Sequence, residues 1–251
     1  MVLRIILWKL QTEAHTMNKL ISLELKRNSL RSYHTGVFIS GALILGLLYL
    51  LAAIPKLDPS ETDLEMFMSY RSLVGLTNIM LMVIFTILSA VMSAKFIIEE
   101  YAGKRAILLF SYPISRQKVL SAKMCMIFLY TVTAMCLCGM AIFGIFFGTE
   151  SVFQICSDTL SLTTILYCNF SLVCYSLLAG VWGIIALWIG FGKQSVTITI
   201  VAAVIISVVM CQIIAMTLNY FIGAVIFLAV GSIGAVIAWN NLKTDIANME
   251  V

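Results

Sequence analysis

The stretch KFIIEEYAGKRAILLFSYPISRQKVLSAK, residues 95–123, is a charged interruption in an otherwise apolar chain. It holds six of the sixteen Lys and Arg residues, and two carboxylates, Glu99 and Glu100, close the apolar run that precedes it. We expect the helix to break at Gly103, because a residue without a Cβ turns the chain easily. Pro113 ends the next short element, since proline lacks an N–H and disfavours helix in the residue before it. The stretch therefore predicts a short helix between two breaks, on the charged side of a membrane.

The composition of the whole chain indicates an integral membrane protein. Hydrophobic residues make up 61% of the 251 residues and charged residues only 11%, whereas a soluble domain carries about a quarter charged residues. Apolar runs of about twenty residues match the thickness of a bilayer core. The formal net charge of +4 fits the excess of Lys and Arg in cytoplasmic loops better than binding to a nucleic acid or another acidic partner.

Six apolar segments are long enough to cross a bilayer, which predicts an all-α fold, a polytopic membrane protein with six transmembrane helices. The transmembrane domain occupies residues 36–240, with an N-terminal segment (1–35) before it and a short tail (241–251) after it. The predicted spans are residues 36–54, 73–94, 123–148, 163–189, 195–216 and 220–239. We expect Pro55 to close the first span and residues 190–194 to form a tight turn.

The charges that flank the spans predict that both termini and the segment at residues 95–122 lie in the cytoplasm. Counting Lys and Arg in alternate loops places fourteen on one side and only two, Lys56 and Arg71, on the other, and cytoplasmic loops carry the excess. Residues 18–33, which precede the first span, mix leucines with basic residues. This pattern is typical of an amphipathic helix in the cytoplasmic interface, and the alternative is an ordinary solvated stretch.

Apart from Lys123, with which the third span opens, the predicted spans contain no charged residue. Ion-coupled carriers and proton pumps keep ionisable groups at membrane depth to bind or relay the ion, so the sequence argues against those classes. Neutral polar residues do occur in the spans, chiefly Asn78, Asn169 and Gln212. They are candidates to line a substrate path, with interhelical hydrogen bonding as the alternative.

No arrangement of residues in the sequence points to catalysis or to metal binding. Both histidines, His15 and His34, precede the predicted spans, whereas an intramembrane protease or a zinc enzyme needs such groups clustered at membrane depth. The phosphate-binding pattern G-x-x-x-x-G-K-[ST] does not occur either. We therefore expect no enzymatic activity, no metal and no cofactor on this chain.

The charged interruption resembles the corresponding region in the permease subunits of ABC-2 type ABC transporters. The resemblance rests on residues that such permeases commonly carry between their second and third spans: Glu99, Glu100, Gly103, Pro113, Ser115, Arg116 and Lys123. In topology it extends over the whole chain, through the basic amphipathic segment and the six spans. Two features depart from the pattern, since Lys104 stands where threonine is frequent and the turn at residues 190–194 is short for a second coupling loop.

The resemblance implies that the segment at residues 99–116 is a coupling helix that docks on a separate ATP-hydrolysing subunit, which binds ATP and Mg²⁺. The coupling residues are then Glu99, Glu100, Gly103, Lys104, Arg105, Ile107, Leu108, Leu109, Phe110, Pro113 and Arg116. The apolar members would fill a cleft of the partner, and the charged members would make polar contacts around it. The alternative is that these side chains only pack against the cytoplasmic ends of neighbouring spans.

The resemblance also implies a multi-pass protein of the bacterial plasma membrane that pairs with a second permease, identical or paralogous, to enclose a path. An apolar interior suits a peptide or another amphipathic or hydrophobic compound better than an ion or a sugar. Small permeases of this kind serve antimicrobial peptide export or immunity. The alternatives are an ATP-independent channel or facilitator and a membrane scaffold without transport activity.

Overall fold

The computed structural model describes residues 21–22, 30–57, 69–101, 116–153, 162–215 and 221–247, and every regular element in these ranges is a helix. The long helices are α2 (Arg31–Leu57), α3 (Tyr70–Ser93), α6 (Arg116–Phe153), α7 (Leu162–Phe191), α8 (Val196–Ala215) and α9 (Phe221–Ala247). Helix α3 continues directly into a π-helical turn, η2 (Ala94–Ile98), and a last turn, α4 (Glu99–Tyr101).

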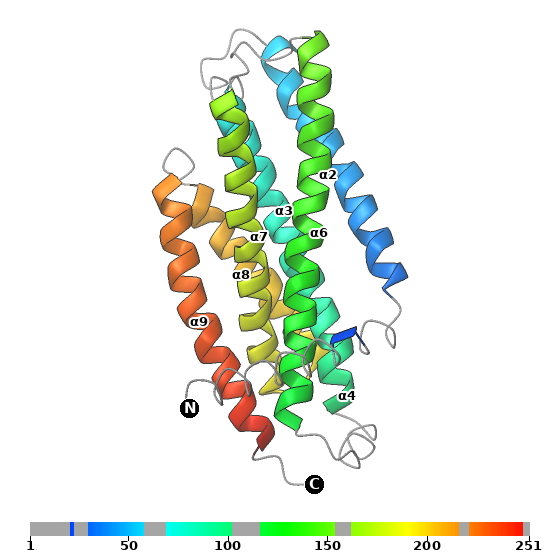
Figure 1. Ribbon diagram of the computed structural model, residues 1–251, viewed down its shortest axis with the longest axis vertical. Coiled ribbons are helices and arrows are strands. Elements are labelled where there is room, and N and C mark those ends of the chain that lie inside the picture. The colour runs from blue at the N-terminus through cyan, green and yellow to red at the C-terminus, as the bar shows by residue number, and fades with distance from the viewer. Residues whose placement is uncertain are drawn as a thin grey trace, which may run out of the picture.

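The structure confirms the all-α fold with six helices that are long and apolar enough to cross a membrane. Successive helices run in opposite directions through the bundle (Figure 1). The end of α4, the start of α6 and the ends of α7 and α9 therefore lie at the same end of the molecule. The interfacial helix predicted at residues 18–33 falls largely outside the described residues.

Helices α3 and α7 form the centre of the bundle. In their most apolar stretches 67% and 72% of the residues are buried, against 22% in α2, α8 and α9. Met82 and Phe85 of α3 and Leu178 of α7 are fully buried in one apolar cluster. The outer helices direct large apolar side chains outward, such as Phe38 on α2 and Ile205 on α8. An apolar outer surface of this kind faces lipid or another membrane helix.

Two helices extend beyond the predicted spans and bring charges into the bundle. The helical run that contains α3 and α4 ends at Tyr101 rather than near residue 94, and α6 begins seven residues before Lys123. Lys123, Glu100 and Glu150 are all buried. The expectation of an uncharged interior is therefore wrong near both ends of the bundle, because the longer helices carry groups that looked like flanking charges into the packed interior.

The first span also ends later than predicted. Helix α2 continues past Pro55 to Leu57, so Pro55 does not close it. A proline lacks the N–H that would donate to the carbonyl four residues earlier. Pro55 lies in the last turn of α2, so the helix loses one hydrogen bond near its end and the earlier turns are unaffected.

The tight turn predicted between the fourth and fifth spans is present and joins α7 to α8. The backbone N–H groups of Lys193 and Ser195 both donate to the carbonyl oxygen of Gly190, at 3.2 Å. Gln194 adopts a left-handed backbone conformation with a φ of 46°. Gly190 lies so near Thr199 on α8 that an added Cβ would stand 2.8 Å from the Thr199 Cα. The turn thus holds α7 and α8 in very close contact.

Candidate functional site

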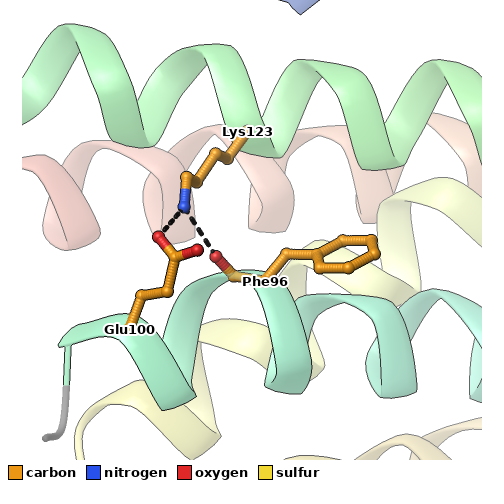
Figure 2. Close-up of polar contacts among 3 residues, drawn as sticks. All are labelled: Phe96, Glu100 and Lys123. Atoms are coloured by element: carbon orange, nitrogen blue, oxygen red, sulfur yellow. Dashed lines mark hydrogen bonds and ion pairs between the residues drawn. The ribbon is translucent and has the colours of Figure 1, made fainter. Parts of the chain in front are cut away.

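An ion pair between Lys123 on α6 and Glu100 on α4 is buried at one end of the bundle (Figure 2). Lys123 has no exposed surface, and Glu100 is 7% exposed. The Lys123 ammonium also donates a hydrogen bond to the carbonyl oxygen of Phe96, at 2.9 Å. One side chain therefore joins the end of the α3–η2–α4 run to the first turns of α6.

The π-helical turn η2 presents the carbonyl that Lys123 contacts. In an α-helix each carbonyl accepts from the N–H four residues further on, whereas a π turn shifts this pairing by one residue. Phe96 is the central residue of η2. Figure 2 shows its carbonyl oxygen and the Glu100 carboxylate on the same side of the helix, both facing the ammonium. Single π turns inside α-helices occur frequently at functional sites, so we take this turn as part of the site.

The elements that carry the ion pair meet in one apolar cluster. Leu120 and Met124 on either side of Lys123 belong to it, together with Ile97 of η2, Leu187 of α7 and Leu242 of α9. Moving a charge from water into such surroundings is strongly unfavourable unless an opposite charge and hydrogen bonds compensate. The two charges therefore depend on each other, and the pair fixes where α4 and α6 meet.

Glu100 and Lys123 both belong to the sequence pattern of the charged interruption, which does not pair them. The resemblance assigned Glu100 to contacts with a partner protein, whereas the structure places the Glu100 carboxylate inside the bundle, on Lys123. A signal for the pair was present in the sequence. An acidic residue ends one span and a lysine opens the next, and two consecutive antiparallel helices bring those ends together.

The other predicted coupling residues flank the ion pair or fall outside the described residues. Glu99 is exposed at the end of the helical run, and Arg116 is the first residue of α6. The remaining predicted coupling residues lie outside the described residues, and they are Gly103, Lys104, Arg105, Ile107, Leu108, Leu109, Phe110 and Pro113. The described residues before and after the gap end at Tyr101 and begin at Arg116, so both ends of the predicted coupling segment, residues 99–116, are at the end of the bundle that holds the ion pair (Figure 1).

A second polar cluster ties the helices together at the opposite end of the bundle. The Tyr70 hydroxyl at the start of α3 donates to the Glu150 carboxylate near the end of α6, at 2.8 Å. Tyr49 of α2 shares a hydrogen bond of 2.5 Å with Thr149. Tyr70 and Glu150 are almost fully buried. Sequence reasoning missed this cluster because Glu150 lies two residues beyond the predicted end of the third span.

The three polar residues predicted as candidates for a substrate path do not gather on one surface. Asn78 is fully buried, and its amide donates to the Ser171 hydroxyl of α7 at 3.2 Å. This contact is the interhelical hydrogen bond of the alternative interpretation. The Asn169 amide donates to the carbonyl of Ile165 within α7, at 2.9 Å. Gln212 is exposed on α8.

Comparison with known proteins assigns the chain to a family. A family model described as ABC-2 family transporter protein matches residues 20–209. The chain belongs to this family. The matched region begins before α2 and ends within α8, so it includes both partners of the ion pair, Glu100 and Lys123. Members of the ABC-2 family are membrane components of transporters, and membership implies an ABC ATPase as a partner.

A relative in Bacillus subtilis (strain 168), the uncharacterized protein YcbO, is 26% identical over 187 residues. The aligned residues make up 74% of this chain and 80% of YcbO. No solved structure matches the chain. Within the described residues, no group of three or more His, Cys, Asp or Glu side chains could hold a metal ion.

Proposed function

We propose that this chain is the permease subunit of an ABC transporter and that residues 99–116 couple it to a separate ATPase subunit. The observation that carries the proposal is the buried pair of Glu100 and Lys123. The pair joins α4, at the start of this segment, to α6, which begins at its last residue. A displacement of that segment by the ATPase would therefore reach α3 and α6 together.

Coupling of this kind requires no chemistry from the permease itself. ATP and Mg²⁺ bind to the partner, and the partner's change of shape favours one arrangement of the membrane helices over another. A rigid connection between the docking segment and the spans makes such a shift effective, because a loose connection would absorb the movement. The buried ion pair and its apolar surroundings supply that rigidity.

A second permease, identical or paralogous, completes the transport path in this proposal. The centre of the single chain is filled by apolar side chains of α2, α3, α6, α7 and α8, so a path is better placed between two bundles than inside one. The exposed apolar faces of the outer helices provide surface for such a contact. We propose export of an amphipathic or hydrophobic cargo, an antimicrobial peptide among them, because the charges of the described spans lie near the helix ends.

A pull-down of the tagged protein in mild detergent, followed by mass identification and an ATPase assay, tests the proposal. We expect a stoichiometric nucleotide-binding subunit. Replacing both Leu108 and Leu109 by Asp is expected to weaken its retention at least about tenfold, because charges would enter an apolar docking surface. Membrane insertion should be unchanged, since both residues lie outside the predicted spans.

The matched control replaces Leu108 and Leu109 by Met, which keeps the surface apolar and of similar volume. This variant should retain the ATPase subunit. Unchanged ATPase association and transport in the aspartate variant would contradict the coupling assignment. Recovery of the protein without any ATPase under gentle conditions would favour a channel or a scaffold instead.

The orientation of the chain is tested by labelling with a membrane-impermeant thiol reagent added outside intact cells. We expect the reagent to label Cys156, in the predicted outer loop, in a variant whose other cysteines are replaced by alanine. Cysteines introduced by Lys104→Cys or Lys193→Cys should react only after permeabilisation, since positively charged loops stay in the cytoplasm. Labelling of Lys104→Cys in intact cells would reverse the orientation.

A further inference from the structure

An apolar groove with a volume of about 450 Å³ lies on the outside of the bundle between α6, α7 and α9. Phe128 of α6, Ile184 of α7 and Val236 and Trp239 of α9 form part of its lining, which is almost entirely apolar. A volume of this size is in the range of sites that bind small molecules. The side chains of the spanning helices do not fill the groove, so the bilayer has access to it.

Two lysines follow the groove lining toward one end of the bundle, one on α9 and one on α6. Lys243 lies one turn beyond Trp239 on α9, and its ammonium stands 5.6 Å from the centre of the Trp239 ring. Lys118 is exposed on α6. It lies seven residues before Cys125, which lines the groove, and a spacing of seven residues returns to the same face of a helix. Both lysines therefore continue the groove toward the end of the bundle.

Helices α6 and α9 are in contact at this cationic end. The Gln117 side chain donates a hydrogen bond of 3.3 Å to the backbone carbonyl of Lys243, which places the start of α6 against the end of α9. Asp245 is exposed two residues after Lys243, and that spacing turns it to the other side of α9. The side of α9 that continues the groove thus carries positive charge.

We propose that this groove binds one anionic phospholipid, with an acyl chain along the apolar lining and the phosphate at Lys118 and Lys243. Lys118 and Lys243 belong to the start of α6 and the end of α9, which lie at the same end of the bundle as α4 (Figure 1). The choice of leaflet rests on the proposed function, in which this end faces the cytoplasm. Basic pockets between spanning helices on that side bind anionic headgroups. Tryptophan prefers the same depth, which agrees with the place of Trp239 beside the cation.

Native mass spectrometry of the purified permease tests the proposal. The protein is exchanged into micelles with equal amounts of phosphatidylglycerol and phosphatidylcholine that carry the same acyl chains. We expect one retained phosphatidylglycerol, preferred over phosphatidylcholine by about twenty-five-fold, because each of the two lysines near an anionic headgroup contributes a preference of roughly fivefold. The double variant Lys118→Gln/Lys243→Gln should lower the preference to within about twofold of unity.

The matched control is Lys193→Gln, which removes an exposed lysine in the turn after α7 and should keep the preference. Ser232→Phe, which fills the groove and leaves both lysines in place, should abolish retention of the lipid while the melting temperature confirms folding. Glycerol phosphate without acyl chains should not displace the lipid, and displacement would show that a free phosphate suffices.

Besides displacement by glycerol phosphate, two results would overturn the lipid site. One is an equal retention of both lipids by the unmodified protein, and the other is a loss in Lys193→Gln as large as in the double variant. The measurement needs only the permease. Failure to find an ATPase partner would therefore refute the proposed function and leave the lipid site standing. Equal retention of both lipids would refute the lipid site and leave the proposed function standing.

Discussion

Replacing Lys123 by methionine is expected to lower the free energy of unfolding by about 3–5 kcal/mol. The change leaves the Glu100 carboxylate in the bundle without its ion-pair partner and removes the donor that Lys123 supplies to the Phe96 carbonyl. Methionine has a similar length and no charge, so little of the loss comes from packing. Reversible unfolding of the purified protein in detergent, with denaturant as the variable, measures the difference.

The double variant Lys123→Met/Glu100→Leu should recover most of this stability. Replacing both members of a buried ion pair by apolar groups of similar size is often neutral, because the desolvation penalty of both charges disappears with their attraction. Lys118→Met is the matched control on the same helix. Lys118 is exposed, and its replacement should change stability by no more than about 0.5 kcal/mol. A loss of stability in Lys118→Met as large as that in Lys123→Met would contradict the role assigned to Lys123.

The same double variant separates stability from coupling. If the ion pair only stabilises the bundle, a double variant with restored stability should transport normally. If the pair connects the coupling segment to α3 and α6, we expect ATP hydrolysis to continue while transport falls, because apolar side chains do not hold the two helix ends in one geometry as an ion pair does. The ratio of transport to ATP hydrolysis distinguishes the two roles.

The sequence was sufficient to predict the number and order of the spanning helices, because each span is a long apolar run between charged or turn-forming residues. It was not sufficient to predict where the helices end. The residues around Glu100 and Lys123 are polar enough to read as a loop, yet the two charges compensate each other and allow the helices to continue. The sequence shows two separate charges, whereas the position of the helix ends depends on whether these charges form an ion pair.

The arrangement of the helices could not be predicted from the sequence either. All six spans are apolar, so hydropathy does not show that α3 and α7 are central while α2, α8 and α9 lie outside. That difference comes from packing between helices. The polar residue Asn78 illustrates this, because the same amide could line a path or bind another helix, and its hydrogen bond to Ser171 of α7 does not follow from the sequence.

Replacing Gly190 by alanine is expected to destabilise the protein by up to about 3 kcal/mol. A Cβ at this position would overlap the Thr199 hydroxyl oxygen and stand 2.7 Å and 2.8 Å from the Cβ and Cα of Thr199. Because one of these atoms is backbone, a rotamer change cannot relieve the overlap, and α7 and α8 must separate. Thr199 is fully buried, so separation would also open a packed interface.

Two further glycines make this a graded test. At Gly183 of α7 an added Cβ would meet only the side chain of Ser89, with the Ser89 Cβ at 2.8 Å. Gly183→Ala should therefore be harmful alone and rescued by Ser89→Gly. At Gly148 of α6 nothing lies within 4 Å of the added atom, so Gly148→Ala should leave the melting temperature unchanged or raise it slightly, since alanine favours helix. The order of the three melting temperatures measures how closely the helices approach, and a large loss in Gly148→Ala would instead indicate that a second permease covers that face of α6.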